Sequence, residues 1–361
     1  MSWRDRVRKG LRPLAAYDVP PLPAEVKLDA NESPYSPPRA LYDAIAEALP
    51  SSALHRYPDP RASRLRAAVA ADLAQPPERL VFGNGSDELI GLLCATFAEP
   101  RDGAARLVYP APSFVVYRTA AAAAGMEAVE APLGARFAAD AQALADAMER
   151  ARPSLAFVAT PNNPTGTRWP DGAMRAIARA FPETVLIVDE AYAMYSATSH
   201  LALVDEMEHV GVLRTYSKVG LAGLRVGVLV GQPALAAEVE KVRPPYNLGT
   251  LPQLAAALAI ERFRGALSSH VAEVVAERER MARAIAALDG IEVFPSEANL
   301  LLVRVADAGK LWRALLARSV LVRNLDRPGA LAGCLRVTVG TPAENDRFLA
   351  ALAAALAERG G

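Results

Sequence analysis

Four segments of the chain place reactive or charged side chains directly after an apolar run. They are "GNGSDE" from residue 83, "TPNNPTG" from 160, "VLIVDEAY" from 185 and "LRTYSKVGLAGLRVG" from 213. A lysine at the end of an apolar strand can form a Schiff base where burial lowers its pKa, so Lys218 is a candidate nucleophile. A carboxylate in the same position is costly to bury alone, so Asp189 requires a cation or a strong donor.

Three further features accompany this lysine and this carboxylate. Gly85, Ser86 and Asp87 follow a strand and open a helix, so their backbone N–H groups could bind an anion, although an ordinary helix cap has the same pattern. In "TPNNPTG" the prolines and the glycine fix a turn that directs the amide of Asn163 toward the sheet edge. Arg225, one short loop after the lysine, carries a charge that suits a phosphate.

One ligand, pyridoxal phosphate, would use all of these groups at once. We assign its aldehyde to Lys218, its pyridine nitrogen to Asp189, and its ring hydroxyl to Asn163 and Tyr192. The residues assigned to its phosphate are Gly85, Ser86, Asp87, Ser217 and Arg225. ATP and nicotinamide sites are disfavoured, because the chain has neither the glycine-and-lysine phosphate loop nor a glycine-rich dinucleotide fingerprint after its first strand.

These segments need a sheet that brings their ends together. From residue 79 onward short β-branched runs alternate with alanine-rich stretches, which is typical of a mainly parallel sheet with helices on both faces. Ligands of such sheets bind at the carboxyl ends of the strands. The proline-rich start predicts an extended arm, and a helix is expected from Pro38 to about Leu49. We expect a long charged helix at 268–288, an arm of residues 1–40, a large domain of 41–275 and a small α/β domain of 276–361.

Composition excludes several classes of function. The 361 residues exceed the roughly 250 to 300 residues at which single cores stop growing, which favours two domains. Forty basic residues balance forty acidic ones, so neither nucleic acid nor an anionic membrane is an expected partner. No run of about 18 uncharged apolar residues is present, and we expect a cytoplasmic protein. Cys94 and Cys334 predict buried reduced thiols and no metal site. The four histidines lie outside every motif, so we expect them to be solvated or capping.

The motifs, in their order along the chain, resemble those of the fold-type I aminotransferases and, among them, the histidinol-phosphate aminotransferases. Besides the four segments above, the matching stretches are "LDANESPY" (28–35), "RYPDP" (56–60), "YPAPSFVVY" (109–117), "SEANLLLVRV" (296–305) and "CLRVTVGTPAEN" (334–345). They span nearly the whole chain. "PNNPTG", "DEAY" and the lysine segment mark the superfamily. "RTYSKVGLAGLRVG", "KVRPPYN" and "LRVTVGTPAEN" together point to the histidinol-phosphate branch.

The resemblance implies a large domain with a mainly parallel seven-stranded sheet and a smaller α/β C-terminal domain. It implies that Lys218, Asp189 and Tyr192 are catalytic residues, and that Phe114 stacks on the ring of the cofactor, pyridoxal 5'-phosphate. Tyr57 matches a tyrosine that reaches the cofactor phosphate of the neighbouring subunit. A homodimer with shared active sites is therefore implied, with the arm packed against the small domain and the partner.

The resemblance also implies a substrate. Arg336 matches an arginine that binds the substrate's anionic group, and Arg323 and Tyr17 match residues assigned to the substrate phosphate. Guanidinium groups suit both carboxylate and phosphate. The implied reaction converts histidinol phosphate and 2-oxoglutarate into imidazole acetol phosphate and glutamate, a step of histidine biosynthesis. Because "NESPYSPP" departs from the commoner family pattern, no contact is transferred from Asn31.

Three alternatives stay open. Two share the fold, namely an aromatic amino-acid aminotransferase and a threonine-phosphate decarboxylase. The choice between deprotonation and decarboxylation depends on which substrate bond lies perpendicular to the ring, and the sequence does not contain that orientation. The third is a non-enzymatic homologue that binds the cofactor as a sensor. The intact Lys218, Asp189 and Arg336 and the lack of a basic DNA-binding extension argue against it.

Overall fold

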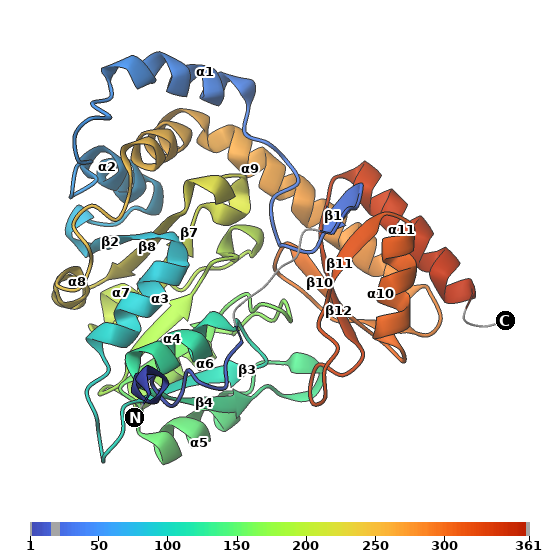
Figure 1. Cartoon of the computed structure of the whole chain (residues 1–361), viewed down its shortest axis with the longest axis horizontal. Coiled ribbons are helices and arrows are strands. Elements are labelled where there is room, and N and C mark those ends of the chain that lie inside the picture. Colours follow the sequence, from blue (N-terminus) through green and yellow to red (C-terminus); the bar gives the residue numbers. More distant parts are fainter. Residues whose placement is uncertain (1, 16–21, 359–361) are drawn as a thin grey trace.

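The computed structural model describes residues 2–15 and 22–358, and a single long helix, α9 (Thr250–Ala286), runs between its two β-sheets (Figure 1). The larger sheet has seven strands in the order β2-β8-β7-β6-β5-β3-β4. Strands β4, β3, β5, β6 and β7 pair in parallel, whereas β8 is antiparallel to both β7 and β2. The strands are β2 (Leu80–Asn84), β3 (Arg106–Ala111), β4 (Glu127–Pro132), β5 (Leu155–Ala159), β6 (Val185–Asp189), β7 (Val210–Thr215) and β8 (Val226–Gly231). The predicted mainly parallel seven-stranded sheet is confirmed.

Alternate residues of these strands belong to two separate cores, because side chains along a strand point to opposite faces of the sheet. On β7, Val210 and Val212 join one core and Leu213 joins the other. The first core includes residues of α2 (Ser63–Leu73), α5 (Ala141–Ala151), α6 (Asp171–Ala180), α7 (Ala202–Glu206) and α9. The second includes residues of α3 (Gly85–Thr96), α4 (Val116–Ala124) and α8 (Pro233–Glu240). Helices therefore cover both faces, as the sequence predicts.

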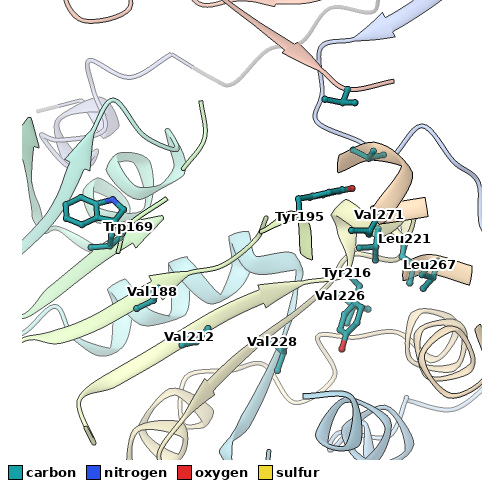
Figure 2. Packing of buried hydrophobic residues seen from close by; sticks show 14 of the residues in the cluster. Trp169, Val188, Tyr195, Val212, Tyr216, Leu221, Val226, Val228, Leu267 and Val271 are labelled. Atoms are coloured by element: carbon teal, nitrogen blue, oxygen red, sulfur yellow. The ribbon is translucent and has the colours of Figure 1, made fainter. Parts of the chain in front are cut away.

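The first core supports the strand ends that carry the candidate site. Figure 2 shows Val188, Val212 and Val228 on the neighbouring strands β6, β7 and β8, and Leu221 close to Val271 of α9. All five side chains are buried. Burying an aliphatic side chain of this size contributes about 1.5 to 3 kcal/mol, so this packing fixes the ends of β6 and β7 relative to α9.

The smaller sheet has the strand order β1-β11-β12-β10-β9. Its strands are β1 (Val26–Leu28), β9 (Ile291–Val293), β10 (Leu300–Val305), β11 (Val320–Asn324) and β12 (Cys334–Thr338), and its helices are α10 (Ala308–Ala317) and α11 (Pro342–Ala357). Strand β1 comes from the N-terminal arm and pairs in parallel with β11, with Val26 opposite Val320. Figure 1 shows β1 beside strands from the other end of the chain. The N-terminal segment therefore completes the smaller sheet.

Helix α9 belongs to both parts of the molecule. The charged helix predicted at 268–288 is its second half, and its first half packs on α1 (Arg39–Ala48) and α2. Its C-terminal part contacts β9 and α11 of the smaller unit. Because the predicted boundary at residue 275 lies inside this helix, the division into 1–40, 41–275 and 276–361 stays a prediction. The helix expected from Pro38 to Leu49 is α1.

Within residues 2–15 and 22–358, no helix is long and apolar enough to cross a membrane. The same part of the chain contains no group of three or more side chains that could hold a metal ion. Cys94 and Cys334 are free and buried, as predicted. Burial raises the pKa of the Cys94 thiol to about 12, so this thiol stays protonated and unreactive at neutral pH.

Candidate active site

A cavity of about 280 Å³ lies where β5, β6 and β7 end, between the larger sheet and residues of the arm and the smaller sheet. Its volume is close to the roughly 300 Å³ lower end of small-molecule pockets. The predicted site residues that line it are Ser86, Asp87, Phe114, Asn163, Asp189, Tyr192, Ser217, Lys218, Arg225, Arg323 and Arg336. Gly85 precedes this set directly in the chain. Tyr57 lies outside the cavity, and Tyr17 falls outside the described residues.

Lys218 stands on a short 3-10 turn, Ser217–Val219, directly after β7. The turn ends at Gly220, whose φ of 95° favours glycine, and a Cβ there would lie 3.0 Å from a backbone oxygen. The Tyr195 hydroxyl donates a hydrogen bond to the Lys218 carbonyl. The Nζ atom of Lys218 lies 5.4 Å from the centre of the Tyr192 ring. The turn thus fixes the lysine backbone and leaves its amine in the cavity.

Asp189 ends β6 and is buried. The Tyr117 hydroxyl donates to its Oδ2 atom at 2.6 Å, and the Ala191 N–H donates to Oδ1 at 3.0 Å. Burial raises the pKa of Asp189 above its ordinary value, and these two neutral donors oppose that rise only in part. A cationic N–H group bound in the cavity would therefore be strongly favoured beside this carboxylate.

Asn163 is aimed by the turn that follows β5. Gly166 has a φ of 73°, and a Cβ there would lie 2.3 Å from Ser296 Oγ, so the turn requires glycine. The Gly166 N–H donates to the Asn162 carbonyl at 2.7 Å, and Asn162 Nδ2 donates to a backbone oxygen at 2.9 Å. Arg336 Nη1 donates to Asn163 Oδ1 at 2.7 Å. Since the arginine uses the amide oxygen, the group that Asn163 offers a ligand is its NH₂ donor.

The N-terminus of α3 is pressed against β8 at the other end of the cavity. The Gly85 N–H donates to the Arg225 carbonyl at 2.7 Å. A Cβ on Gly227 would lie 2.5 Å from Ser86 N, so only glycine at 227 lets the helix approach this closely. Arg225 Nη2 lies 2.7 Å from Asp87 Oδ2. Backbone N–H groups at a helix N-terminus together with a guanidinium form an anion site.

The helix-cap interpretation of this segment does not account for its geometry. The residue at the N-cap position, Asn84, makes no side-chain capping hydrogen bond.

Ser217 is predicted to bind the same anion. Its Oγ lies 2.9 Å from Thr215 Oγ1, and its N–H donates to that hydroxyl at 3.1 Å. These bonds set the position of the Ser217 hydroxyl on the cavity wall.

Arg323 and Arg336 enter the cavity from the smaller sheet. They stand opposite each other on the antiparallel strands β11 and β12, so both side chains lie on one face. Arg336 Nη2 also donates to the Asp29 carbonyl at 2.6 Å, which ties β12 to the arm. Two guanidinium groups on one wall suit a ligand that carries a carboxylate or a phosphate.

The sequence between residues 23 and 352 matches the family model described as "Aminotransferase class I and II". The chain belongs to this family. This aminotransferase is 43% identical to histidinol-phosphate aminotransferase 2 of Burkholderia pseudomallei, over 98% of each chain. It is 41% identical to histidinol-phosphate aminotransferase 1 of Burkholderia lata, again over 98% of each chain.

The fold of the aminotransferase also matches a solved structure. The histidinol-phosphate aminotransferase of Sinorhizobium meliloti, solved in complex with pyridoxal-5'-phosphate, superposes with a TM-score of 0.84. The sequences are 26% identical, and the match covers 93% of this chain and 92% of that chain. The fold expected from the sequence motifs is confirmed.

The residues of this aminotransferase fit pyridoxal phosphate on three observations. A buried carboxylate with a raised pKa, Asp189, would stabilise a protonated ring nitrogen. The glycine at 227 leaves room for an uncapped helix N-terminus, where a phosphate would bind. Lys218 lines the same cavity as these two groups, and so does Phe114. The charge and chemistry of the donor set thus correspond to the parts of the cofactor.

Sequence reasoning missed several residues of this site. Tyr117 contacts Asp189, and Asn31 Nδ2 donates to the Tyr192 hydroxyl at 3.0 Å. Tyr117 belongs to a matched motif, "YPAPSFVVY", but no role had been assigned to it. Its position one helical turn after Phe114 is the signal that could have indicated a shared wall.

The expectation for His200 is wrong. This histidine is only 3% exposed, and its backbone N–H donates to Glu190 Oε1 at 2.5 Å. Arg214 Nη2 lies 2.7 Å from Glu190 Oε2, and Ser199 Oγ donates to the same oxygen at 3.1 Å. Glu190 directly follows Asp189, so its side chain points to the opposite side of the strand end. No sequence pattern indicates this cluster, because its members lie on separate segments of the chain.

Proposed function

We propose that the chain is a pyridoxal-phosphate-dependent aminotransferase that uses histidinol phosphate and 2-oxoglutarate, and forms imidazole acetol phosphate and glutamate. The proposal rests on one observation above all. A single cavity combines Lys218 and Asp189 from the larger sheet with Arg323 and Arg336 from the smaller one. The first pair suits the cofactor, and the second pair suits the anionic group of each substrate.

When bound, pyridoxal phosphate supplies an aldehyde for the substrate amine and a ring that accepts the electron pair of the broken C–H bond. Lys218 would hold the cofactor through its aldehyde, and its Nζ amine would act as the general base that moves the proton at the substrate carbon. Asp189 keeps the ring nitrogen protonated, while Asn163 and Tyr192 donate hydrogen bonds to the ring oxygen.

The remaining residues hold the two ends of the bound molecules. The N-terminus of α3, with Ser217 and Arg225, binds the cofactor phosphate, and Phe114 covers the ring. Arg336 binds a substrate carboxylate or phosphate, and Arg323 adds a second charge for the phosphate monoester. Tyr17 is assigned to the same phosphate. A cytoplasmic location stays a prediction from the sequence.

We also propose a homodimer in which Tyr57 completes the partner's site. Tyr57 is 79% exposed and stacks on Tyr246, which is 45% exposed, with ring centres 4.5 Å apart. Further exposed apolar side chains lie near each member of this pair in the sequence. They are Tyr42, Leu49 and Leu54 before Tyr57, and Val242 and Leu251 on either side of Tyr246. An aromatic pair exposed in this way favours burial against a second copy.

Mixed dimers test the shared site. In a dimer of one Lys218→Ala chain and one Tyr57→Ala chain, one site keeps both Lys218 and a partner Tyr57. Mixing two impaired variants should therefore restore activity to at most half that of the native dimer. Absence of any recovery after verified subunit exchange would refute the role of Tyr57 in the partner's site.

The substrate is tested by a half-reaction. The cofactor-loaded protein is mixed with histidinol phosphate in the absence of keto acid, and the cofactor's visible absorbance is followed by stopped flow. Rapid, saturable bleaching is expected, with none in Lys218→Ala. Bleaching by phenylalanine or tyrosine instead would favour the aromatic aminotransferase, and release of carbon dioxide from threonine phosphate would favour the decarboxylase.

A further inference from the structure

Asn31 is a buried polar residue to which no role has been assigned. It lies in the segment between β1 and α1, and only 1% of its surface is exposed. Its φ of 55° is left-handed, a conformation that asparagine and glycine accept better than other residues. A buried polar side chain in this conformation is retained only where surrounding contacts fix it.

Three of the contacts of Asn31 join it to the smaller sheet. Its backbone N–H donates to Thr338 Oγ1 at 2.9 Å, and its carbonyl accepts from Asn299 Nδ2 at 3.1 Å. The Thr338 hydroxyl donates to Asn31 Oδ1 at 3.2 Å. Since Thr338 accepts the backbone N–H and donates to the amide oxygen, it determines which way the Asn31 amide points.

The fourth contact reaches Tyr192, in the segment that follows β6 of the larger sheet. The amide is oriented so that Nδ2 donates to the Tyr192 hydroxyl oxygen at 3.0 Å. A phenol has one proton, and an amide NH₂ group cannot accept it. The Tyr192 proton must therefore point elsewhere, and Tyr192 lines the cavity. An acceptor at this position, in contrast, would attract that proton away from the cavity.

We propose that Asn31 is a positioning residue that directs the Tyr192 hydroxyl proton toward the cofactor's ring oxygen. The inference rests on the proposed function, because the ring oxygen belongs to pyridoxal phosphate. It assigns a role in the chemistry to the N-terminal segment, because Asn31, which lines the cavity beside Tyr192, acts through the Tyr192 hydroxyl. The smaller sheet, through Thr338, controls a hydrogen bond made from the larger one.

The consequence is measurable in the absorbance of the loaded enzyme. A donor on the ring oxygen withdraws negative charge from it and so weakens its hold on the proton of the neighbouring lysine-linked nitrogen. Loss of that donor raises the pH at which the visible absorbance changes. The charged groups around this position are Asp29, Asp87, Asp189, Lys218, Arg225, Arg323 and Arg336. Asn31→Gly alters none of them, whereas Asn31→Asp adds a carboxylate beside them.

Two substitutions at residue 31 distinguish the contribution of the side-chain amide from that of the backbone hydrogen bonds. Asn31→Gly accepts the left-handed φ without strain and keeps the bonds to Thr338 Oγ1 and Asn299 Nδ2 that the backbone makes. Asn31→Asp keeps the shape and the Oδ1 acceptor but replaces the donor by an oxygen and adds a negative charge, which raises the midpoint in the same direction. Asn31→Gly is therefore the deciding variant. Tyr192→Phe removes the hydroxyl itself. Asn299→Ala is the matched control, because it removes one backbone anchor of residue 31 and leaves the amide in place.

The experiment is a pH titration of the visible absorbance of each loaded variant, together with its thermal unfolding. Tyr192→Phe should raise the midpoint by about one unit, the size of one hydrogen bond to a charged group. Asn31→Gly and Asn31→Asp should raise it in the same direction. Asn31→Gly combined with Tyr192→Phe should have the midpoint of Tyr192→Phe alone, because the effect passes through the hydroxyl. Asn299→Ala should keep the native midpoint.

Three results would overturn the inference alone. The first is a native midpoint in Asn31→Gly while Tyr192→Phe is shifted. The second is a shift in Asn31→Gly that persists in full beside Tyr192→Phe. The third is the same shift in Asn299→Ala, which would make residue 31 an anchor of the loop only. If Tyr192→Phe itself leaves the midpoint unchanged, the proposed role of Tyr192 fails, and the inference fails with it.

Discussion

The buried ion pair behind Asp189 leads to a prediction that can be worked out from the structure. The Glu190 side chain is fully buried, and Arg214, whose side chain is 12% exposed, lies 2.7 Å from it. We predict that Arg214→Leu strongly destabilises the folded protein. The reason is that a carboxylate without its cation would remain in the protein interior.

The magnitude follows from the partners that remain. Removing one partner of a buried pair costs about 3 to 5 kcal/mol when the other charge is left uncompensated. Glu190 would still accept hydrogen bonds from the His200 backbone N–H and from Ser199 Oγ. We therefore expect a loss of about 3 kcal/mol, at the lower end of this range.

The loss should depend on pH in a defined direction. Burial disfavours the charged form of Glu190, but the His200 hydrogen bonds and the Arg214 charge outweigh it and hold the pKa below its ordinary value of 4.5. In the native protein this group contributes stability above its ordinary pKa, and that stability is lost as the pH falls through the lowered pKa. Without Arg214 the pKa rises, so the variant can protonate Glu190 in mild acid. The free energy of unfolding lost in Arg214→Leu should therefore be smaller at about pH 5 than at about pH 8.

The assay is urea unfolding of Arg214→Leu and the native protein at both pH values, followed by fluorescence. Arg179→Leu is the control, because Arg179 is 69% exposed and lies 3.8 Å from Glu206. Such a surface pair is worth about 0 to 1 kcal/mol, so the control should unfold almost as the native protein does. A deficit for Arg214→Leu below about 1 kcal/mol at pH 8, or one that does not shrink in acid, would refute the reasoning.

Three further predictions concern the cofactor and the substrate. Gly227→Ala should weaken pyridoxal phosphate binding at least about tenfold in a fluorescence titration, because the added Cβ would lie 2.5 Å from Ser86 N. The control Gly223→Ala should bind the cofactor normally, because a Cβ there has nothing within 4 Å. Asp189→Asn should lower the rate of the half-reaction by roughly two to three orders of magnitude, because the ring nitrogen loses its carboxylate; stopped flow would contradict this with a near-native rate. Arg323→Ala should raise KM for histidinol phosphate far more than KM for glutamate, and equal increases in steady-state assays would remove its phosphate role.

Much of the site was predictable from the sequence, because its main residues lie directly after the strands of the larger sheet. Lys218, Asp189 and Asn163 each follow an apolar run, and the carboxyl ends of parallel strands must meet at one edge of a sheet. The alternation of strands and helices predicts that arrangement. The same reasoning does not predict β4, whose sequence "EAVEAP" lacks a β-branched apolar run. This strand lies at the sheet edge, and Ala131 is its one buried residue.

The sequence by itself determined the parallel sheet, the types of side chain at the carboxyl ends of its strands, and the buried state of the two cysteines. Only the tertiary structure decided which residues support them. Asn31 and Tyr192 are 161 positions apart, and Tyr117 and Asp189 are 72 apart. The reason is physical: periodicity and turn chemistry act over a few residues, whereas the partner of a buried polar group is set by the packing of distant segments. Asn31 is the clearest case, because its position is set by the smaller sheet and its contact lies in the larger one.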